Sequence, residues 1–362
     1  MKLNLLFVGT KFLYNEPLQE YVVRQAKKVC DYVASICFYK DGENSLFLDL
    51  EEMFKEEKNI LIVASKQNFP MIGKLVCTIT EDNLVLKDEI LIPSKAILFE
   101  KSSYLIEYKG TKANILMLDE MQKMPSILFS EEKRGAVIQL FDEDESSAKV
   151  LLDTLSQTYD VKLELVTLID GWIEVHIESK KHGNIKEFIH SVKQLLPKKI
   201  IPAANIMSYI IKRLENQKKT ITFAESCTGG LLSYFLTQNN GASKIFNGSL
   251  ITYSNEIKST WLAVDKEILQ EFGAVSKETV TQMSEGVMSV SEADYAISIS
   301  GIAGDDGGTP QKPVGTVFIG VRSKRGDIYQ QLLLKGDRNY VQYQSVLYAI
   351  KMLLLHDRES FF

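Results

Sequence analysis

The sequence predicts a multidomain α/β protein, and three observations support this fold class. At 362 residues the chain is longer than one ordinary hydrophobic core organises, so two or three domains are expected. Short apolar runs alternate with segments of helical spacing, which is typical of an α/β layer with a largely parallel sheet. A polar stretch at 130–135 and a candidate linker at 196–202 interrupt this pattern. We therefore expect domains at 1–132, 133–198 and 199–362.

The composition argues against several classes of protein. With 45% hydrophobic and 25% charged residues, the chain has the profile of a folded globular protein. Its net charge of −5 argues against a main role in neutralising nucleic-acid phosphates, so no nucleic-acid partner is expected. The apolar run 5–8 is too short for a signal peptide, and no stretch has the length of a membrane span. We expect a cytoplasmic protein without a membrane partner. The four cysteines form no C-x-x-C pair, so neither a zinc site nor a disulfide framework is predicted.

The expected elements follow from hydrophobic spacing and turn residues. The first domain combines a helix behind Pro17 with five strands, and the second is a small α+β unit with a linker after it. The third domain alternates strands and helices and is the richest in glycine. The first domain has strands at 3–9, 35–39, 59–65, 104–109 and 113–118 and a helix at 17–35. The second has strands at 135–141, 162–169 and 172–179, helices at 145–159 and 185–196, and the linker 196–202. The third has strands at 220–226, 249–254, 294–304, 316–323 and 328–335 and helices at 205–217, 227–238, 256–262, 277–290 and 339–355.

Ser226 lies where a strand is expected to run into a helix. In such a turn the next backbone N–H groups lack helical partners, and glycines keep the backbone open to a ligand. The residues concerned are Cys227, Thr228 and Gly229. The turn can therefore hold a nucleophile beside an oxyanion site. The alternative is that Ser226 only caps the helix, which is the commoner role of serine there.

A serine nucleophile needs a base, and histidine is the usual one. No histidine lies between Ser226 and residue 355, so a Ser-His-Asp triad within the third domain is not expected. The remaining candidates are a lysine with a lowered pKa or a tyrosine that passes the proton on. Lys258 and Tyr253 supply both. The alternative is that Tyr253 is a half-buried strand residue and Lys258 a solvated helix charge.

Two further segments carry candidate binding groups. The glycine-rich stretch 301–317 can form a concave anion site, although it fits neither the P-loop nor the dinucleotide fingerprint and is otherwise a long turn. Arg338, near the start of the last helix, can bind a phosphate bidentately. Alone, it is equally well read as a surface ion-pair partner.

Taken together and in order, these motifs resemble the CinA C-terminal family, also known as PncC-type nicotinamide mononucleotide deamidases. The similarity covers almost all of 200–355. The matching blocks are AESCTGG (224–230), GAS (241–243), FNG (246–248), TYSNEIK (252–258), GAVS (273–276), GIAG (301–304), KPVGTV (312–317) and GDR (336–338). Two departures are visible: Asp305 replaces a usual proline, and Gln342 stands where many relatives carry a second arginine.

The resemblance implies that the protein deamidates nicotinamide mononucleotide in pyridine nucleotide recycling. It implies Ser226 as nucleophile, Lys258 as general base and Tyr253 as an assisting group. The substrate would be bound by Cys227, Thr228, Gly229, Ser300, Gly301 and Arg338. It implies no cofactor and no metal, and a homodimer. The alternative function is a non-catalytic scaffold in competence or the DNA damage response.

The resemblance extends more weakly to the rest of the chain. Full-length relatives carry a molybdopterin-biosynthesis-like domain, linked in the family to ADP-ribose pyrophosphatase activity, and then a KH-like unit. Here GTKF (9–12) and ASKQNFPMIG (64–73) replace the family's acidic and glycine motifs. We therefore expect a degenerate first domain, with residual pyrophosphatase activity as a weaker alternative. The second domain has KKHGN (180–184) instead of a G-x-x-G loop, so RNA binding is not expected.

Overall fold

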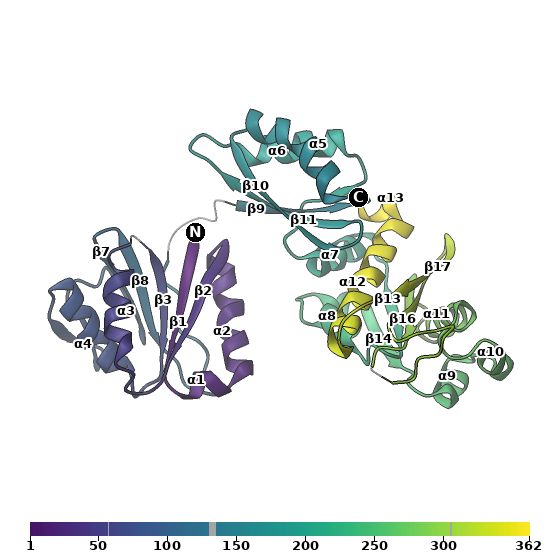
Figure 1. The fold of residues 1–362 in the computed structure, drawn as a ribbon, viewed down its shortest axis with the longest axis horizontal. Coiled ribbons are helices and arrows are strands. Elements are labelled where there is room, and N and C mark those ends of the chain that lie inside the picture. The colour runs from purple at the N-terminus through teal and green to yellow at the C-terminus, as the bar shows by residue number, and fades with distance from the viewer. Residues whose placement is uncertain (57, 130–134, 305) are drawn as a thin grey trace. The chain divides into compact units, whose positions relative to one another are not determined.

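The computed structural model describes residues 1–56, 58–129, 135–304 and 306–362 (Figure 1). The predicted boundary at 132/133 and Asp305 lie outside these described residues. The chain forms two compact units, Met1–Gly135 and Ala136–Phe362. Within the described ranges, no helix is both long enough and apolar enough to cross a membrane. The protein is thus a mixed α/β chain with several sheets.

The N-terminal unit is built on a six-stranded sheet with the order β2-β1-β3-β8-β7-β6. The first four strands in this order pair in parallel, and β7 pairs antiparallel with both β8 and β6. Its strands are β1 (Lys2–Val8), β2 (Tyr32–Tyr39), β3 (Asn59–Ala64), β6 (Leu98–Glu100), β7 (Ser103–Tyr108) and β8 (Thr111–Met117), and β4 (Leu84–Lys87) and β5 (Ile90–Pro93) form a separate hairpin. Its helices are α1 (Lys11–Tyr14), α2 (Glu16–Val29), α3 (Ser45–Met53) and α4 (Phe69–Thr80). Helix α2 covers one face of the sheet, and α3 and α4 cover the other (Figure 1).

The helix predicted over 17–35 is too long. It ends at Val29, and the chain from Tyr32 onward forms β2. The segment 32–39 is rich in β-branched and aromatic residues, and it pairs in parallel with β1, beginning with Tyr32 opposite Lys2. The strand ladder along β1 therefore outweighs the helical spacing of the apolar residues.

The second unit begins with a four-stranded sheet of order β10-β11-β9-β12. It contains β9 (Gly135–Phe141), α5 (Glu145–Thr158), β10 (Val161–Ile169), β11 (Trp172–Ser179), α6 (Ile185–Leu195) and β12 (Ile200–Ile201). The expected linker 196–202 is not free, because Ile200 and Ile201 pair antiparallel with Leu140 and Gln139. Both isoleucines are buried, and this apolar burial holds them against β9.

A five-stranded sheet of order β14-β13-β15-β16-β17 forms the rest of the unit. Strands β14, β13 and β15 are parallel, and β16 and β17 continue antiparallel. Its strands are β13 (Ile221–Glu225), β14 (Phe246–Ile251), β15 (Tyr295–Gly301), β16 (Thr316–Ser323) and β17 (Gly326–Leu333). Its helices are α7 (Ile206–Gln217), α8 (Leu231–Thr237), α9 (Asn255–Leu262), α10 (Lys266–Glu271), α11 (Lys277–Ser291), α12 (Arg338–His356) and α13 (Arg358–Phe361), with a short 3-10 turn at Ala242–Lys244.

Alternating residues of these strands face two separate helical layers. Phe223 and its neighbours pack with α7, α8 and α12, whereas Ala224 packs with α9, α10 and α11. The result is an α/β/α sandwich. Phe141 and Trp172 of the four-stranded sheet join the first of these cores, so the segments predicted as second and third domains form one compact unit.

Candidate active site

The candidate residues of the third domain meet at one edge of its sheet. Ser226 follows β13, Thr252 follows β14, and Gly301 ends β15. Because β14, β13 and β15 are adjacent and parallel, their carboxyl ends lie side by side. This edge of an open α/β sheet is the usual place for a ligand.

Lys258 and Ser226 are in direct contact. Lys258 lies on α9 and its side chain is fully buried, so the interpretation as a solvated helix charge is wrong. Its Nζ lies 2.9 Å from Ser226 Oγ, 2.7 Å from the Thr252 carbonyl oxygen and 3.2 Å from the Tyr253 carbonyl oxygen. No carboxylate forms an ion pair with Lys258 among the described residues.

Burial without an acidic partner changes the protonation of this lysine. Desolvation lowers the pKa of Lys258 from 10.5 to about 8, because the charged form loses its hydration and gains no counter-charge. A thiolate at the neighbouring Cys227 would oppose this shift. About one tenth of the amine is therefore neutral at pH 7, and a general base requires this neutral form.

Ser226 does not cap helix α8, so the capping interpretation is wrong. The helix starts at Leu231, four residues later than predicted, with Gly230 at its N-cap. Its first N–H groups donate instead to the buried Glu225 carboxylate, from Gly230 at 3.1 Å, Leu232 at 3.1 Å and Ser233 at 2.9 Å. Sequence reasoning gave Glu225 no role, although an acidic residue before a helix was the available signal. The Ser226 hydroxyl is left for Lys258.

The three residues predicted to bind substrate through their backbone amides differ in whether the N–H group is free to donate. The Gly229 N–H donates to the Ser226 carbonyl oxygen at 3.1 Å, so it is not a free donor. The Cys227 and Thr228 N–H groups donate to no backbone acceptor among the described residues. The Cys227 thiol is buried, and burial raises its pKa to about 12, so it stays neutral. Ser226 is therefore the candidate nucleophile in this turn, with two amides beside it.

Tyr253 contributes its main chain and not its ring. Its carbonyl oxygen accepts from Lys258, while its side chain is 65% exposed and lies beyond the end of β14. The interpretation as a half-buried strand residue is thus wrong. No hydrogen bond joins the phenol to Ser226 or Lys258. Within the described part of the chain, no hydrogen bond therefore offers the phenol a path for passing a proton to either group.

The remaining residues predicted to bind substrate lie in or beside the loops around this turn. Ser300 is buried and donates to the Ala274 carbonyl oxygen at 2.7 Å, so its hydroxyl holds a neighbouring loop. Gly301 allows a close approach, since a Cβ there would meet Cys227 Sγ at 3.1 Å. At Gly304 a Cβ would lie 2.0 Å from Nη2 of Arg338, so the guanidinium rests directly on this loop.

Arg338 is an exposed cation beside this loop. It is the first residue of α12, and the described residues offer its exposed guanidinium no ion pair or hydrogen bond. The alternative of a surface ion-pair partner is therefore not supported. An exposed guanidinium with all donors free fits the bidentate binding of a phosphate.

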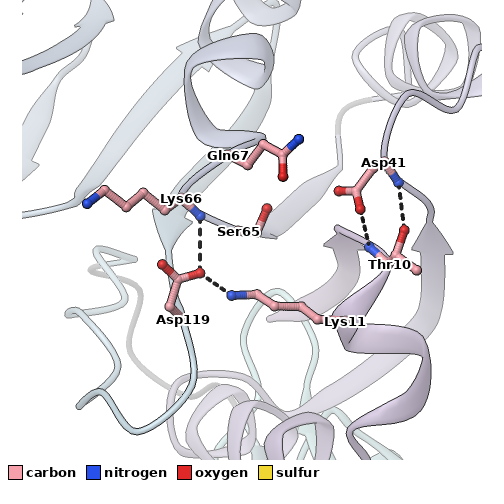
Figure 2. Close-up of a pocket in the computed structure, with 7 residues that line it drawn as sticks. All are labelled: Thr10, Lys11, Asp41, Ser65, Lys66, Gln67 and Asp119. Carbon is pink, nitrogen blue, oxygen red and sulfur yellow. Dashed lines mark hydrogen bonds and ion pairs between the residues drawn. The ribbon is translucent and has the colours of Figure 1, made fainter.

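The N-terminal unit has a separate pocket of about 490 Å³ (Figure 2). It lies at the carboxyl ends of the parallel strands, where β1 is flanked by β2 on one side and β3 on the other. Asp119 accepts from the Lys66 backbone N–H at 3.3 Å and pairs with the Lys11 ammonium, as Figure 2 shows. Asp41 and Thr10 exchange two hydrogen bonds on the other side.

The segments that replace the family motifs supply most of this pocket. Thr10 and Lys11 come from GTKF, and residues 65–67 come from ASKQNF. Both aspartates are already engaged by neighbouring side chains and amides. No group of three or more His, Cys, Asp or Glu is placed to hold a metal ion in the described part of the chain. We assign no reaction to this pocket.

Known proteins resemble this chain most clearly in its C-terminal part. Residues 203–356 match the family model described as CinA C-terminal domain. A competence-damage inducible protein of Thermoanaerobacter pseudethanolicus is 34% identical over 284 residues, which are 76% of this chain and 65% of that protein. A CinA-like protein of Thermotoga neapolitana is 32% identical over 254 residues, 67% of this chain and 59% of the relative.

Among solved structures, the competence/damage inducible protein of Agrobacterium tumefaciens shows 33% sequence identity with a TM-score of 0.41. The match covers 42% of this chain and 96% of that protein. The chain thus spans 65% and 59% of the length of the two curated relatives. Over residues 203–356, the chain belongs to the CinA C-terminal domain family.

Proposed function

We propose that this protein is an amidohydrolase that converts nicotinamide mononucleotide to nicotinate mononucleotide and ammonia. The observation that carries the proposal is the buried contact of 2.9 Å between Lys258 Nζ and Ser226 Oγ. Membership of the CinA C-terminal domain family supports the choice of substrate. The phosphate of this substrate also matches the free guanidinium of Arg338.

The surroundings of Lys258 suit a neutral amine. A neutral amine has two N–H donors and one lone pair. The carbonyl oxygens of Thr252 and Tyr253 can accept both N–H groups. A carbonyl only accepts, so the lone pair is left for the third neighbour, the Ser226 hydroxyl. When Lys258 is neutral, the Ser226 hydroxyl can therefore donate to its lone pair, whereas the charged ammonium donates to Ser226 Oγ.

The first half-reaction forms an acyl-enzyme. Lys258 takes the Ser226 proton while Ser226 Oγ attacks the carboxamide carbon, and the carbonyl oxygen becomes an oxyanion. The N–H groups of Cys227 and Thr228 are the available donors to that oxyanion. The Lys258 ammonium then gives its proton to the amide nitrogen, the C–N bond breaks, and ammonia leaves.

The second half-reaction restores the serine. The neutral Lys258 takes a proton from water, and the resulting hydroxide attacks the ester carbon of the acyl-enzyme. A second oxyanion forms and collapses, the bond to Ser226 Oγ breaks, and Lys258 returns the proton to Ser226. The product is the nicotinate carboxylic acid. Ser226, Lys258 and water supply every proton, so the scheme needs no cofactor.

A non-catalytic scaffold is the alternative, and the buried lysine weighs against it. A lysine pKa lowered to about 8 corresponds to about 3 kcal/mol of unfavourable desolvation in the charged form. A scaffold gains nothing from an unpaired buried amine beside a serine, since an apolar side chain would pack there without that cost. A Ser-Lys mechanism requires this environment.

Ammonia release from nicotinamide mononucleotide by the purified chain tests the proposal. We expect turnover by the wild type, and background rates for Ser226→Ala. The matched control is Ser233→Ala, which removes a hydroxyl seven residues away that bonds Glu225 and not Lys258. Absence of ammonia release by the folded wild type would refute the proposed function.

A further inference from the structure

Helix α12 contacts the turn that contains Ser226 and Cys227. Gln342 lies one helical turn after Arg338, so both side chains project from the same face. Its Nε2 donates to the Cys227 carbonyl oxygen at 2.7 Å. The partner is a carbonyl and can only accept, so the amide nitrogen of Gln342 must face it. This contact links two segments that lie 115 residues apart.

The bond to Cys227 fixes the orientation of a whole peptide unit. The Cys227 carbonyl and the Thr228 N–H belong to one planar trans peptide, in which the two groups point in opposite directions. With the carbonyl drawn toward Gln342, the Thr228 N–H points away from α12. Thr228 is only 3% exposed.

The Thr228 N–H donates to no acceptor among the described residues. A buried N–H without an acceptor is costly and therefore uncommon. The hydroxyl of the same residue is also buried without a partner in the described chain. Both groups lie two residues after Ser226, where an oxyanion formed on attack would supply the missing acceptor.

We propose that Gln342 is a positioning residue that holds the Cys227–Thr228 peptide so that the Thr228 N–H can bind the oxyanion. The inference rests on the proposed amidohydrolase function. Among the described residues, Gln342 is the only hydrogen-bond donor to the Cys227 carbonyl, and the next two residues, Gly229 and Gly230, both have positive φ (59° and 100°). Glycines rotate easily, so the turn needs an outside contact to keep one orientation.

The expected kinetic effect lies in turnover. Removing one oxyanion donor typically costs about 10²–10³ in kcat. Gln342→Met keeps the length of the side chain but donates no hydrogen bond, so the peptide loses its restraint and not its N–H. We expect kcat to fall about 10- to 100-fold, with KM within threefold of wild type, because the oxyanion exists only after attack.

Two variants separate positioning from packing. Gln342→Arg retains an N–H donor and should recover most of the kcat lost in Gln342→Met. Gln344→Met is the matched control, because Gln344 donates to Lys335 and Tyr340 carbonyl oxygens within its own segment. It should keep wild-type kcat. The pH dependence should be the same in all variants, since Lys258 is untouched.

A second measurement does not depend on activity. In protein labelled with ¹⁵N-threonine, the Thr228 amide resonance, assigned with Thr228→Ser, should shift in Gln342→Met and stay in place in Gln344→Met. An unmoved resonance, or a loss expressed in KM with unchanged kcat, would overturn the positioning role. A shifted resonance in a protein that releases no ammonia would refute the proposed function while supporting the contact itself.

Discussion

Turnover of this protein should follow the ionisation of Lys258. Desolvation lowers the pKa of Lys258 to about 8, and only the neutral amine can take the Ser226 proton. The neutral fraction is about one tenth at pH 7 and about nine tenths at pH 9, by the definition of a pKa. The rate of ammonia release under saturating substrate should therefore rise roughly tenfold between these values and then level off. An ordinary lysine would give a rise that continues beyond pH 10.

Lys258→Met tests the same group by substitution. Methionine has a similar length and volume and suits a fully buried position, but it cannot accept a proton. General-base catalysis contributes about 10²–10⁴-fold, so kcat should fall by at least this factor across the whole pH range. The matched control is Lys266→Met on the neighbouring helix α10, an exposed lysine outside the site.

The same pKa shift predicts how stability changes with pH. Lys258 has its ordinary pKa of 10.5 in the unfolded chain and about 8 in the fold, so between these values the unfolded chain binds more protons. The free energy of unfolding should therefore rise with pH through this window, by up to about 3 kcal/mol in total. Below pH 8 the cost of burying the charge is fully present.

Denaturant unfolding at pH 7.5 and pH 10 measures this difference in the wild type and in Lys258→Met. Other groups titrate in both proteins, so the quantity of interest is the difference between the two pH dependences. A rate that is flat from pH 6.5 to pH 9.5, or Lys258→Met turnover close to wild type, would refute the reasoning.

Four further changes test other parts of the site. Ser226→Ala should remove turnover while changing the melting temperature by only a few degrees, because Ser226 does not cap α8; retained ammonia release would exclude it as the nucleophile. Arg338→Ala should raise KM for nicotinamide mononucleotide about 10- to 100-fold with kcat nearly unchanged, and an equal effect with the phosphate-free riboside would contradict a phosphate contact. Glu225→Gln should lower the free energy of unfolding by about 2–4 kcal/mol, measured with denaturant, because its NH₂ group cannot accept the amides that the carboxylate holds. The N-terminal pocket should not hydrolyse ADP-ribose with Mg²⁺ or Mn²⁺, and phosphate products that disappear in Lys11→Ala would show the opposite.

Much of the C-terminal fold could be predicted from spacing alone. Strands β13 and β15 are buried along almost their whole length, and every strand expected after residue 200 is present, although boundaries moved by a few residues. The prediction that the helix extends to residue 35 was wrong, because β2 depends on a partner strand that local spacing does not reveal. The prediction of a linker at 196–202 was wrong for the same reason, since a two-residue strand is defined only by its pairing with β9.

The sequence by itself determined which chemical groups the site could contain. With no histidine between Ser226 and residue 355, lysine and tyrosine remained as candidate bases, and the family resemblance implied Ser226 as nucleophile. Residue types and spacing alone did not decide between Lys258 and Tyr253 as the base. That choice depended on burial, since Lys258 is fully buried while the Tyr253 ring is 65% exposed.

Only the tertiary structure decided what these groups can do. Ser226 and Lys258 are 32 residues apart in the chain, and Cys227 and Gln342 are 115 residues apart. The pairing of β13 with β14 and the packing of α12 bring each pair together. A pKa is set by desolvation and by neighbouring charges, and the direction of a peptide N–H is set by what its carbonyl binds. Both are properties of three-dimensional surroundings, so residue types and their spacing alone could not specify them.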